Sequence, residues 1–262
     1  MGDFKRKPFG GSFQKNMVNK ETDFIFGIHP IIEALKAGEN IDKVLIKKEL
    51  KGESSKELMS LLHSNRITSQ YVPEQKLNQI TRKNHQGVIA LTSPIPFHNL
   101  GDVITQTYED GKTPLLIVLD GVTDVRNFGA IVRTAECAGA TAVVIPSRGA
   151  ARISSDAVKT SAGAIYHLPI CKESSLVNAL DYLKKSGIQV LAATEKANEN
   201  YSGVDLSVPT AFVMGAEGDG ISRDLLREAD REVSLPILGE VGSLNVSVAA
   251  GVLIYETIRQ RL

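Results

Sequence analysis

Apolar residues in the second half of the chain gather into short uninterrupted runs. The first is Pro114-Leu-Leu-Ile-Val-Leu-Asp120, and a run of this length without polar interruption is typical of a parallel strand buried on both faces. We predict further strands at 142–145, 167–171, 189–193, 211–214 and 232–236. Segments in which apolar residues recur at helical spacing lie between these strands, most clearly at 176–185, at 223–228 and from residue 129 onward. The alternation predicts an open parallel α/β sheet with helices on both faces.

A shorter alternation occupies the first half of the chain. It predicts a small α/β sandwich, with helices at 30–36, 54–63 and 74–81 and strands at 43–46, 69–72 and 87–91. The segment Ser93-Pro-Ile-Pro-Phe-His-Asn-Leu-Gly-Asp102 is expected to begin a linker. Residues 1–22 are rich in Gly, Lys, Asn and Ser and are expected to form a flexible basic arm. The predicted divisions are therefore 1–22, 23–95, 96–113 and 114–262.

Charge is balanced over the 262 residues, with 30 Lys and Arg and 30 Asp and Glu. A net charge of zero argues against non-specific coating of nucleic acid but permits local basic patches. One such excess lies between residues 40 and 85, where nine basic and five acidic residues occur. This local positive excess is suited to contacts with RNA phosphates. The alternative interpretation is an ordinary basic surface exposed to solvent. The candidate RNA contacts are Lys47, Lys48, Arg82 and Lys83.

Several protein classes are disfavoured by the composition. No apolar run is long enough to span a bilayer, and the N-terminus lacks the apolar segment of a secretory signal. Cys137 and Cys171 belong to no CxxC pair, and the five histidines form no ligand cluster. We therefore expect a cytoplasmic protein with two reduced thiols and no metal site.

Ligands of open parallel sheets bind beyond the carboxyl ends of the strands, which here are the loops after Leu119, Met214 and Pro236. The second loop, Gly215-Ala-Glu-Gly-Asp-Gly220, does not match the GxGxxG dinucleotide pattern. Ile221 also occupies the place of the lysine that a triphosphate loop needs. The loop is therefore predicted to hold an uncharged or cationic ligand through closely approaching backbone groups.

The first loop contributes Asn127 and Arg133, which are six residues apart. Asn127 is expected at the end of the loop and Arg133 nearly two turns inside the following helix. Their directions then differ by about two-thirds of a turn, so the spacing alone does not define one site. Taken alone, Arg133 is typical of an exposed helix arginine.

The third loop leads into the last helix, for which Ser243 is the expected N-cap. Asn245 is harder to explain as structure, because asparagine is a mediocre helix former. The expected core stripe of this helix is Leu244, Val248, Val252 and Tyr255.

Three ordered motifs in these loops together resemble a known family. They read Asn127-Phe-Gly-Ala-Ile-Val-Arg133, Met214-Gly-Ala-Glu-Gly218 and Ser243-Leu-Asn-Val-Ser-Val-Ala249. The chain resembles the SpoU (TrmH-type) branch of the SPOUT RNA methyltransferases. Its first domain, with Phe26-Gly-Ile-His-Pro30 and His85-Gln-Gly-Val88, looks like the ribosomal-protein-like RNA-binding domain of the RlmB-type subgroup.

The resemblance implies an α/β catalytic domain tied in a deep trefoil knot, which no periodicity in the sequence predicts. It implies a homodimer that pairs through the last helix. It also implies S-adenosylmethionine as cofactor, held by Gly215, Leu235, Ile237 and Leu244. The catalytic residues that it implies are Asn127, Arg133, Glu217, Ser243 and Asn245.

The implied reaction is methylation of a guanosine ribose 2′-hydroxyl in 23S ribosomal RNA without a metal. A guanidinium is effectively always protonated, so we expect Arg133 to act electrostatically rather than as a general base. Transfer RNA is the alternative substrate, and an inactive RNA-binding homologue and a nucleotide-dependent enzyme are alternative classes. Val125 stands where the family usually has proline, which is expected to soften that loop, and Gly242 stands where serine is common.

Overall fold

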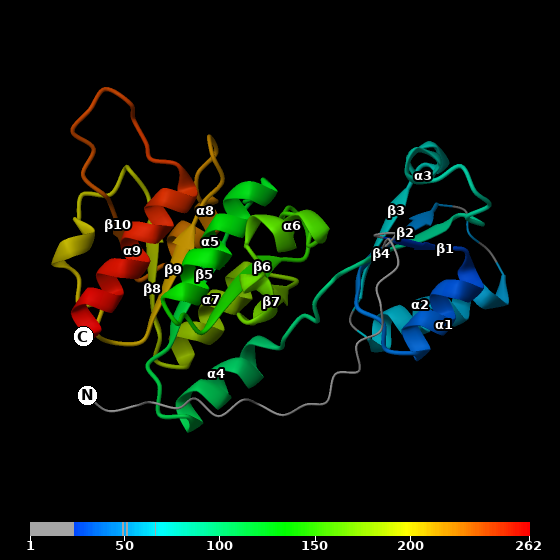
Figure 1. Ribbon diagram of the computed structural model, residues 1–262, viewed down its shortest axis with the longest axis horizontal. Helices are drawn as coiled ribbons and strands as arrows, with labels where there is room; N and C mark the ends of the chain where they lie inside the picture. The colour runs from blue at the N-terminus through cyan, green and yellow to red at the C-terminus, as the bar shows by residue number, and fades with distance from the viewer. Residues whose placement is uncertain (1–23, 49, 51, 66) are drawn as a thin grey trace.

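The computed structural model describes residues 24–48, 50, 52–65 and 67–262 (Figure 1). The predicted arm at 1–22 lies outside the described residues. Two separate sheets form: a four-stranded sheet in the order β1-β4-β2-β3, and a six-stranded sheet in the order β10-β8-β9-β5-β6-β7. Among the described residues no helix is both long and apolar enough to cross a bilayer, and no group of three His, Cys, Asp or Glu is placed to hold a metal.

The N-terminal sheet consists of β1 (Phe24–Phe26), β2 (Ile41–Lys47), β3 (Thr68–Val72) and β4 (Val88–Thr92). Strand β4 is antiparallel to β1 and β2, whereas β3 is parallel to β2. Alternation along β2 divides its side chains between two cores. Val44 packs with α1 (Ile28–Lys36) and α2 (Glu53–Ser64), and Leu45 packs with α3 (Glu74–Ile80) on the other face. The small α/β sandwich is as predicted, apart from the three-residue strand β1.

The C-terminal sheet is parallel throughout, which confirms the predicted class. Its strands are β5 (Leu115–Leu119), β6 (Ala142–Pro146), β7 (Ile170–Glu173), β8 (Gln189–Ala193), β9 (Thr210–Met214) and β10 (Arg231–Val233). All five residues of β5 are buried, with Ile117 in one core and Leu116 in the other. The uninterrupted apolar run follows from this double burial.

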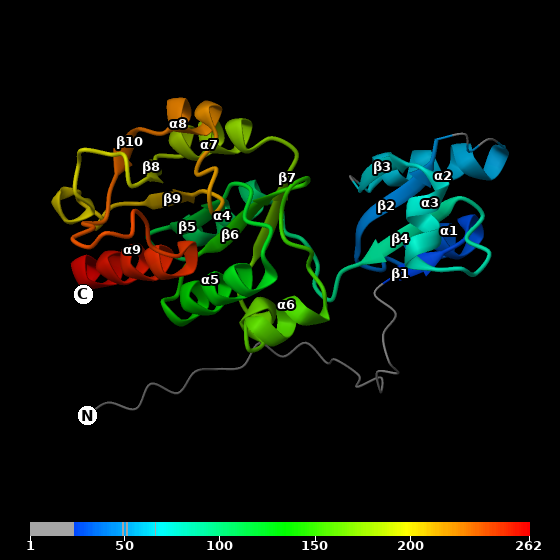
Figure 2. The same ribbon diagram turned by 90° about the horizontal axis from the view of Figure 1, so that it is seen from above.

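Helices cover both faces of this sheet (Figure 2). One face carries α5 (Val125–Cys137), α6 (Ser155–Thr160) and α9 (Val246–Arg261). The other carries α4 (Leu100–Glu109), α7 (Leu176–Lys185) and α8 (Arg223–Glu228). Two 3-10 turns, Ala164–Tyr166 and Tyr201–Gly203, complete the described elements.

Two predicted strands of the C-terminal sheet differ from the structure by three residues at one end. The strand expected at 167–171 is Ile170–Glu173, and the one expected at 232–236 ends at Val233. The residues after Val233 form the loop that leads to α9.

The helix expected from residue 129 begins four residues earlier, at Val125. Asp124 caps it, because its Oδ1 accepts hydrogen bonds from the backbone N–H of Arg126 at 2.7 Å and of Asn127 at 3.0 Å. Gly129 lies inside the helix because α6 packs closely there: a Cβ would lie 2.1 Å from Thr160 Oγ1. Asn127 therefore occupies the first helical turn, which corrects its expected place at the end of the loop.

The predicted linker at 96–113 contains a helix, α4, which the sequence analysis did not predict. Asn99 caps it by accepting a hydrogen bond from Asp102 N at 3.2 Å. Leu100 and Ile104 are buried against the C-terminal sheet. Helix α4 is thus a structural part of the larger domain.

Candidate active site

A pocket of about 450 Å³ opens at the carboxyl ends of β8, β9 and β10, next to the start of α9. This is the edge at which ligands of open parallel sheets bind. Two of the predicted loops, those after β9 and β10, form much of its wall. The lining residues are Ala193, Thr194, Glu195, Met214, Gly215, Ala216, Glu217, Gly218, Gly220, Val233, Leu235, Ile237, Ser243, Leu244, Asn245, Val246, Ala249 and Leu253.

The glycine loop closes tightly on itself at Gly215. Ala216 N donates to Gly220 O at 3.2 Å, and Gly220 N donates back to Ala216 O at 3.0 Å. A Cβ on Gly215 would lie 2.2 Å from the carbonyl carbon of Gly220, so only glycine fits there. Asp120, directly after β5, fixes the far end of the loop by accepting a hydrogen bond from Ser222 N at 2.7 Å.

Three of the predicted catalytic residues meet in one hydrogen-bonded network. Asn127 Nδ2 donates to Glu217 Oε1 at 2.9 Å. Asn245 Nδ2 donates to the same Glu217 oxygen at 2.7 Å and lies 3.0 Å from Asn127 Oδ1, which accepts from it. The network joins the starts of α5 and α9 to the glycine loop.

Asn245 can hold this position because its side chain is also the N-cap of α9. Its Oδ1 accepts from Ser247 N at 2.9 Å and from Ser247 Oγ at 2.6 Å. With the oxygen used by the helix, the amide NH₂ must point toward Glu217. The expectation that Ser243 is the cap was therefore wrong: Ser243 lines the pocket three residues before the helix begins.

The pocket presents negative charge. Glu195 and Glu217 line it, and none of its described lining residues is Lys or Arg. Such a site favours a cation and disfavours phosphate, in agreement with the prediction from the glycine loop. Apolar side chains, among them Leu235 and Leu253, supply a surface for an uncharged ring.

Arg133 stands apart from this network. It is exposed on α5, does not line the pocket, and makes no hydrogen bond or ion pair with any described residue. Helix α5 packs against α9, so Arg133 lies on the same face of the sheet as Asn245 without contacting it. The structure does not bring these two predicted residues together within one chain.

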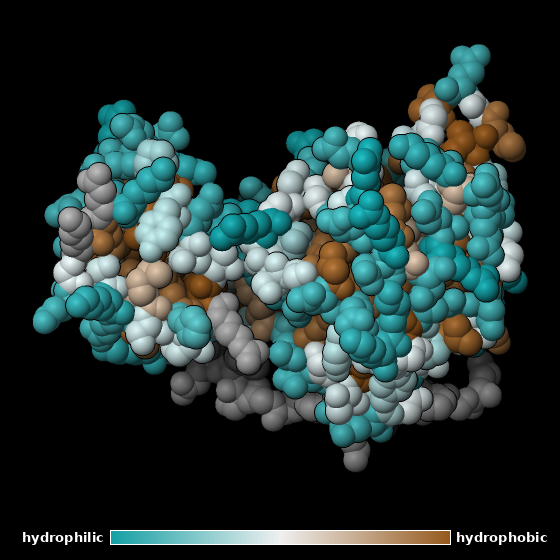
Figure 3. All heavy atoms as spheres, turned by 180° about the vertical axis from the view of Figure 1, so that it is seen from behind, coloured by the Kyte–Doolittle hydropathy of each residue, from teal (hydrophilic) through white to brown (hydrophobic). Residues whose placement is uncertain are grey.

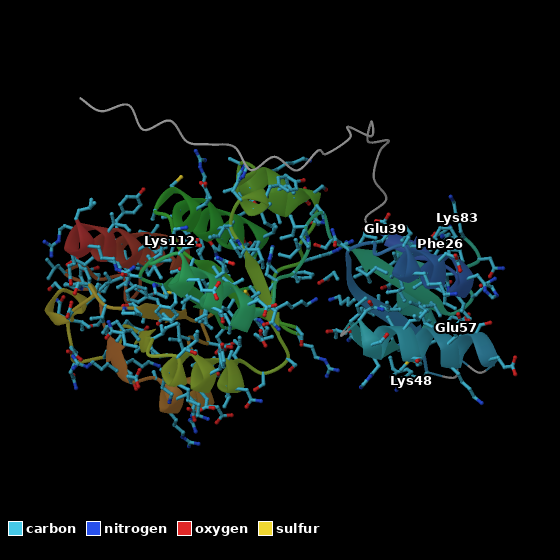
Figure 4. The ribbon with its side chains drawn as sticks, turned by 90° about the horizontal axis from the view of Figure 1, so that it is seen from below. Phe26, Glu39, Lys48, Glu57, Lys83 and Lys112 are labelled. Carbon is cyan, nitrogen blue, oxygen red and sulfur yellow. The ribbon has the colours of Figure 1, made fainter. Side chains whose placement is uncertain are left out.

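A second pocket, of about 470 Å³, lies in the N-terminal domain beside α3. Three of the four predicted RNA contacts line it, namely Lys47, Arg82 and Lys83. Lys47 Nζ is bonded to Glu74 Oε2 at 2.6 Å, and Lys83 Nζ lies 5.8 Å from the centre of the Phe26 ring. In Figure 4 Lys83 and Phe26 lie together on one edge of this domain and Lys48 on the opposite edge. Lys48 is exposed and does not line this pocket.

Two family models match successive parts of the chain. The model described as RNA 2′-O ribose methyltransferase substrate binding matches residues 24–98, and that of the SpoU rRNA Methylase family matches residues 114–255. The chain belongs to the SpoU rRNA methylase family. This SpoU methylase is an S-adenosylmethionine-dependent RNA methyltransferase, as the resemblance implied.

Relatives of this SpoU methylase match it over nearly its whole length. YacO of Bacillus subtilis, whose name places it in the TrmH family of tRNA/rRNA methyltransferases, is 34% identical over 93% of this chain and 98% of its own. An rRNA methyltransferase from Sinorhizobium meliloti, solved with bound AdoMet, has a TM-score of 0.58 at 25% identity and covers 91% of this chain and 87% of its own. AviRb from Streptomyces viridochromogenes, also solved with AdoMet, has a TM-score of 0.58 at 24% identity. The match covers 91% of this chain and 90% of AviRb.

The pocket of this SpoU methylase suits its cofactor. The four residues predicted to hold S-adenosylmethionine all line it: Gly215, Leu235, Ile237 and Leu244. Glu195 and Glu217 provide negative charge for a cationic sulfonium and ammonium, and the apolar walls suit an adenine ring.

Sequence reasoning missed three residues of this site. Thr194 and Glu195 line the pocket because β8 is the neighbour of β9 in the sheet. Asp120 braces the glycine loop from the end of β5. In each case the available signal was a polar residue placed directly after a predicted strand.

Proposed function

We propose that this SpoU methylase transfers a methyl group from S-adenosylmethionine to the ribose 2′-hydroxyl of a guanosine in 23S ribosomal RNA. The observation that carries the proposal is the network of Asn127, Glu217 and Asn245 beside an anionic pocket. The substrate-binding model over residues 24–98 supports an RNA target. Transfer RNA is the alternative, because the relatives are named for both RNAs.

The cofactor supplies an electrophilic methyl group on a positively charged sulfur. Backbone groups at Gly215, Leu235 and Leu244, with the side chain of Ile237, would hold it in the pocket. The ribose oxygen forms its bond to the methyl carbon as the carbon–sulfur bond breaks, which leaves S-adenosylhomocysteine and a released proton. Holding both reactants in line is a large part of such catalysis, and it needs no metal.

We assign Arg133 to act on the nucleophile, which is the ribose 2′-oxygen. Its fixed positive charge would stabilise the developing alkoxide and a neighbouring phosphate. The residues assigned to orienting the ribose are Asn127, Glu217, Ser243 and Asn245. Because Arg133 is exposed and contacts none of them within one chain, a partner subunit would complete the site.

We propose a homodimer through α9, and an apolar surface that continues from the loop before α9 onto that helix supports it. Of the stripe predicted as core, Leu244, Val248 and Tyr255 are exposed, so that prediction was wrong. Leu238 and Val241 project from the loop, with exposed fractions of 99% and 76%. Figure 3 shows this loop standing out from the body, with brown hydrophobic side chains below a hydrophilic tip. We assign this surface to a second copy of the chain, because the site that the family resemblance implies needs a partner subunit.

The remaining assignments belong to the same proposal. Residues 23–95 would bind RNA, with phosphate contacts from Lys47, Lys48, Arg82 and Lys83, and residues 1–22 would add a basic arm. Residues 114–262, together with the α4 segment, would form the knotted catalytic domain. With ribosomal RNA as its substrate, the enzyme would act in the cytoplasm.

Incubation of the purified protein with ribosomal or transfer RNA and S-adenosylmethionine tests the function. We expect ribose methylation of ribosomal RNA without added metal, at a single guanosine found by mapping 2′-O-methyl sites in a deletion strain. Cofactor binding without transfer to either RNA would indicate the inactive homologue. Loss of activity with a chelator and recovery with a metal would contradict the metal-free reaction.

Arg133→Ala should lower kcat by about 100-fold or more, the usual scale for loss of a group that stabilises a developing oxyanion. Binding of S-adenosylmethionine, measured by calorimetry, should stay near wild type because Arg133 does not line the pocket. Arg133→Lys should also be poor, since an ammonium cannot reproduce the planar fork. Full activity in either variant would show that Arg133 takes no part in the reaction.

Sedimentation velocity tests the dimer, which we expect to dissociate in Val248→Glu because this charge would lie in the interface. The exposed position Glu39 provides the control, Glu39→Lys, which should remain dimeric. An active monomer at assay concentrations would refute the shared site.

A further inference from the structure

An ion pair joins the two sheets of the molecule. Lys172 of β7 lies with its Nζ 2.5 Å from Asp42 Oδ1 and 2.7 Å from the backbone oxygen of Asp42 on β2. The two side chains are only 12% and 10% exposed. Desolvating two charges is costly, so a buried pair of this kind depends on both partners being held in good geometry.

A β-bulge places Asp42 for this contact. The register between β2 and β4 shifts between Ile41 and Lys43, which leaves Asp42 as the extra residue. A bulge takes its extra residue out of the ladder and redirects the side chain. Asp42 can therefore offer both its carboxylate and its backbone oxygen to the neighbouring domain.

The segment between the domains is anchored on both sides of the ion pair. At its start, Ser93 N donates to Asn40 O at 2.8 Å, two residues before Asp42. At its end, His98 N donates to Ile170 O at 2.9 Å, two residues before Lys172. The covalent connection and the ion pair thus run side by side across the same gap, and together they resist rotation of one domain against the other.

Phe97 adds a further contact at this point. The centre of its ring lies 4.7 Å from Lys172 Nζ, within the range of a cation–π interaction. Ile95, two residues earlier, is buried in the core of the larger domain. Strand β7 is the edge of the C-terminal sheet that faces the N-terminal domain (Figure 2).

We propose that Asp42 and Lys172 form an interdomain latch that holds the substrate-binding domain in one orientation toward the catalytic pocket. They are positioning residues, because neither lines the pocket. The latch would decide which ribose of a bound RNA reaches the methyl donor. The inference rests on the proposed function, in which the first domain binds the RNA that the second methylates.

Interdomain distances test the latch without RNA. Spin labels are placed at Glu57→Cys and Lys112→Cys, two exposed positions on different domains (Figure 4), in a Cys137→Ser background. Cys171 stays unlabelled, because burial raises the pKa of its thiol to about 12. We expect one narrow distance distribution with the latch intact and a broad one in Lys172→Met. Equal widths would overturn the proposal.

Two further variants keep this test decisive. Asp42→Asn retains the size of the side chain and should fold if Lys172→Met does not, and it should also broaden the distribution. Lys184→Met is the matched control: Lys184 Nζ binds Glu228 O at 2.7 Å and Glu228 Oε2 at 3.0 Å, in the same two-acceptor manner but within one domain. It should leave the distribution narrow, and equal broadening by this control would overturn the latch.

Kinetics separate positioning from general damage. In Asp42→Asn and Lys172→Met we expect kcat for RNA to fall about 10-fold to 100-fold, the scale of a misplaced reactant, while the Kd of S-adenosylmethionine stays at wild type. The double variant should lose no more than the worse single variant, because both act through one contact. Multiplying losses, or an unchanged kcat with a raised KM, would overturn the positioning role. If the wild-type protein methylates no RNA, the proposed function fails, whereas the distance measurement still decides the latch.

Discussion

The pocket at the carboxyl ends of β8 to β10 is lined by Glu195 and Glu217, whereas the pocket beside α3 is lined by Lys47, Arg82 and Lys83. A sulfonium cofactor and a phosphate backbone need electrostatic fields of opposite sign. Placing the two fields in different domains keeps each from repelling the other's ligand. If the basic pocket binds RNA as proposed, each binding event can be disrupted alone.

The largest expected effect comes from the cofactor side. Gly215→Ala puts a Cβ 2.2 Å from backbone that has no room to move, so the glycine loop must open. We expect affinity for S-adenosylmethionine to fall by about 100-fold or more, consistent with several kcal/mol of strain or lost contact. RNA affinity should be unchanged. Gly239→Ala is the control, since a Cβ there meets nothing within 4 Å; equal loss in both variants would contradict this account.

Removal of the first domain should have the next largest effect. A chain beginning at Ser93 should bind S-adenosylmethionine like the full protein but methylate RNA poorly, and its RNA affinity should depend less on salt. A chain beginning at Lys112 also loses α4. Its free energy of unfolding, measured in urea, should be lower by about 3 to 6 kcal/mol, because Leu100 and Ile104 no longer cover the sheet. Identical salt slopes before and after truncation would mean that the first domain does not read RNA.

The smallest effect is expected from single cations of the basic pocket. Arg82→Ala and Lys83→Ala should each weaken RNA binding by about 10-fold or less and lower the salt slope by about 1, with no change in cofactor affinity. Lys36→Ala, which removes an exposed cation paired with Glu57 and Glu33, is the control and should leave the slope unchanged. If the salt dependence of RNA affinity does not change in Arg82→Ala or Lys83→Ala, these cations belong to a solvated surface that does not contact RNA.

Much of the fold was predictable because strands buried on both faces appear in the sequence as short apolar runs. The five buried residues of β5 give an uninterrupted apolar run, which predicts a strand buried on both faces. Helix α4 escaped prediction because its apolar residues are few and the prolines of the preceding segment suggest a linker. The trefoil knot came only from the family resemblance, since threading leaves no local pattern.

The site was predictable in composition but not in geometry. The motif residues Asn127, Glu217 and Asn245 contact one another in the structure. They are 90, 118 and 28 residues apart in the chain, and such separations do not predict how close the side chains lie in space. The helical spacing did not place Arg133 in one site with Asn127, and in the structure Arg133 does not line the pocket. The Asp42–Lys172 contact left no sequence signal at all, because it depends on a bulge and on the docking of two domains.

The pairing of His98 with β7 has a consequence for how the protein is made. An uncovered edge strand is a template for aggregation, and β7 is the edge strand of its sheet that the His98 bridge partly covers. The segment that covers it is synthesised before β7, since it precedes this strand by about 70 residues in the chain. This segment is therefore already outside the ribosome when β7 emerges. A chain that begins at Lys112 lacks His98 and α4, so it should precipitate more readily than a chain that begins at Ser93, which keeps both.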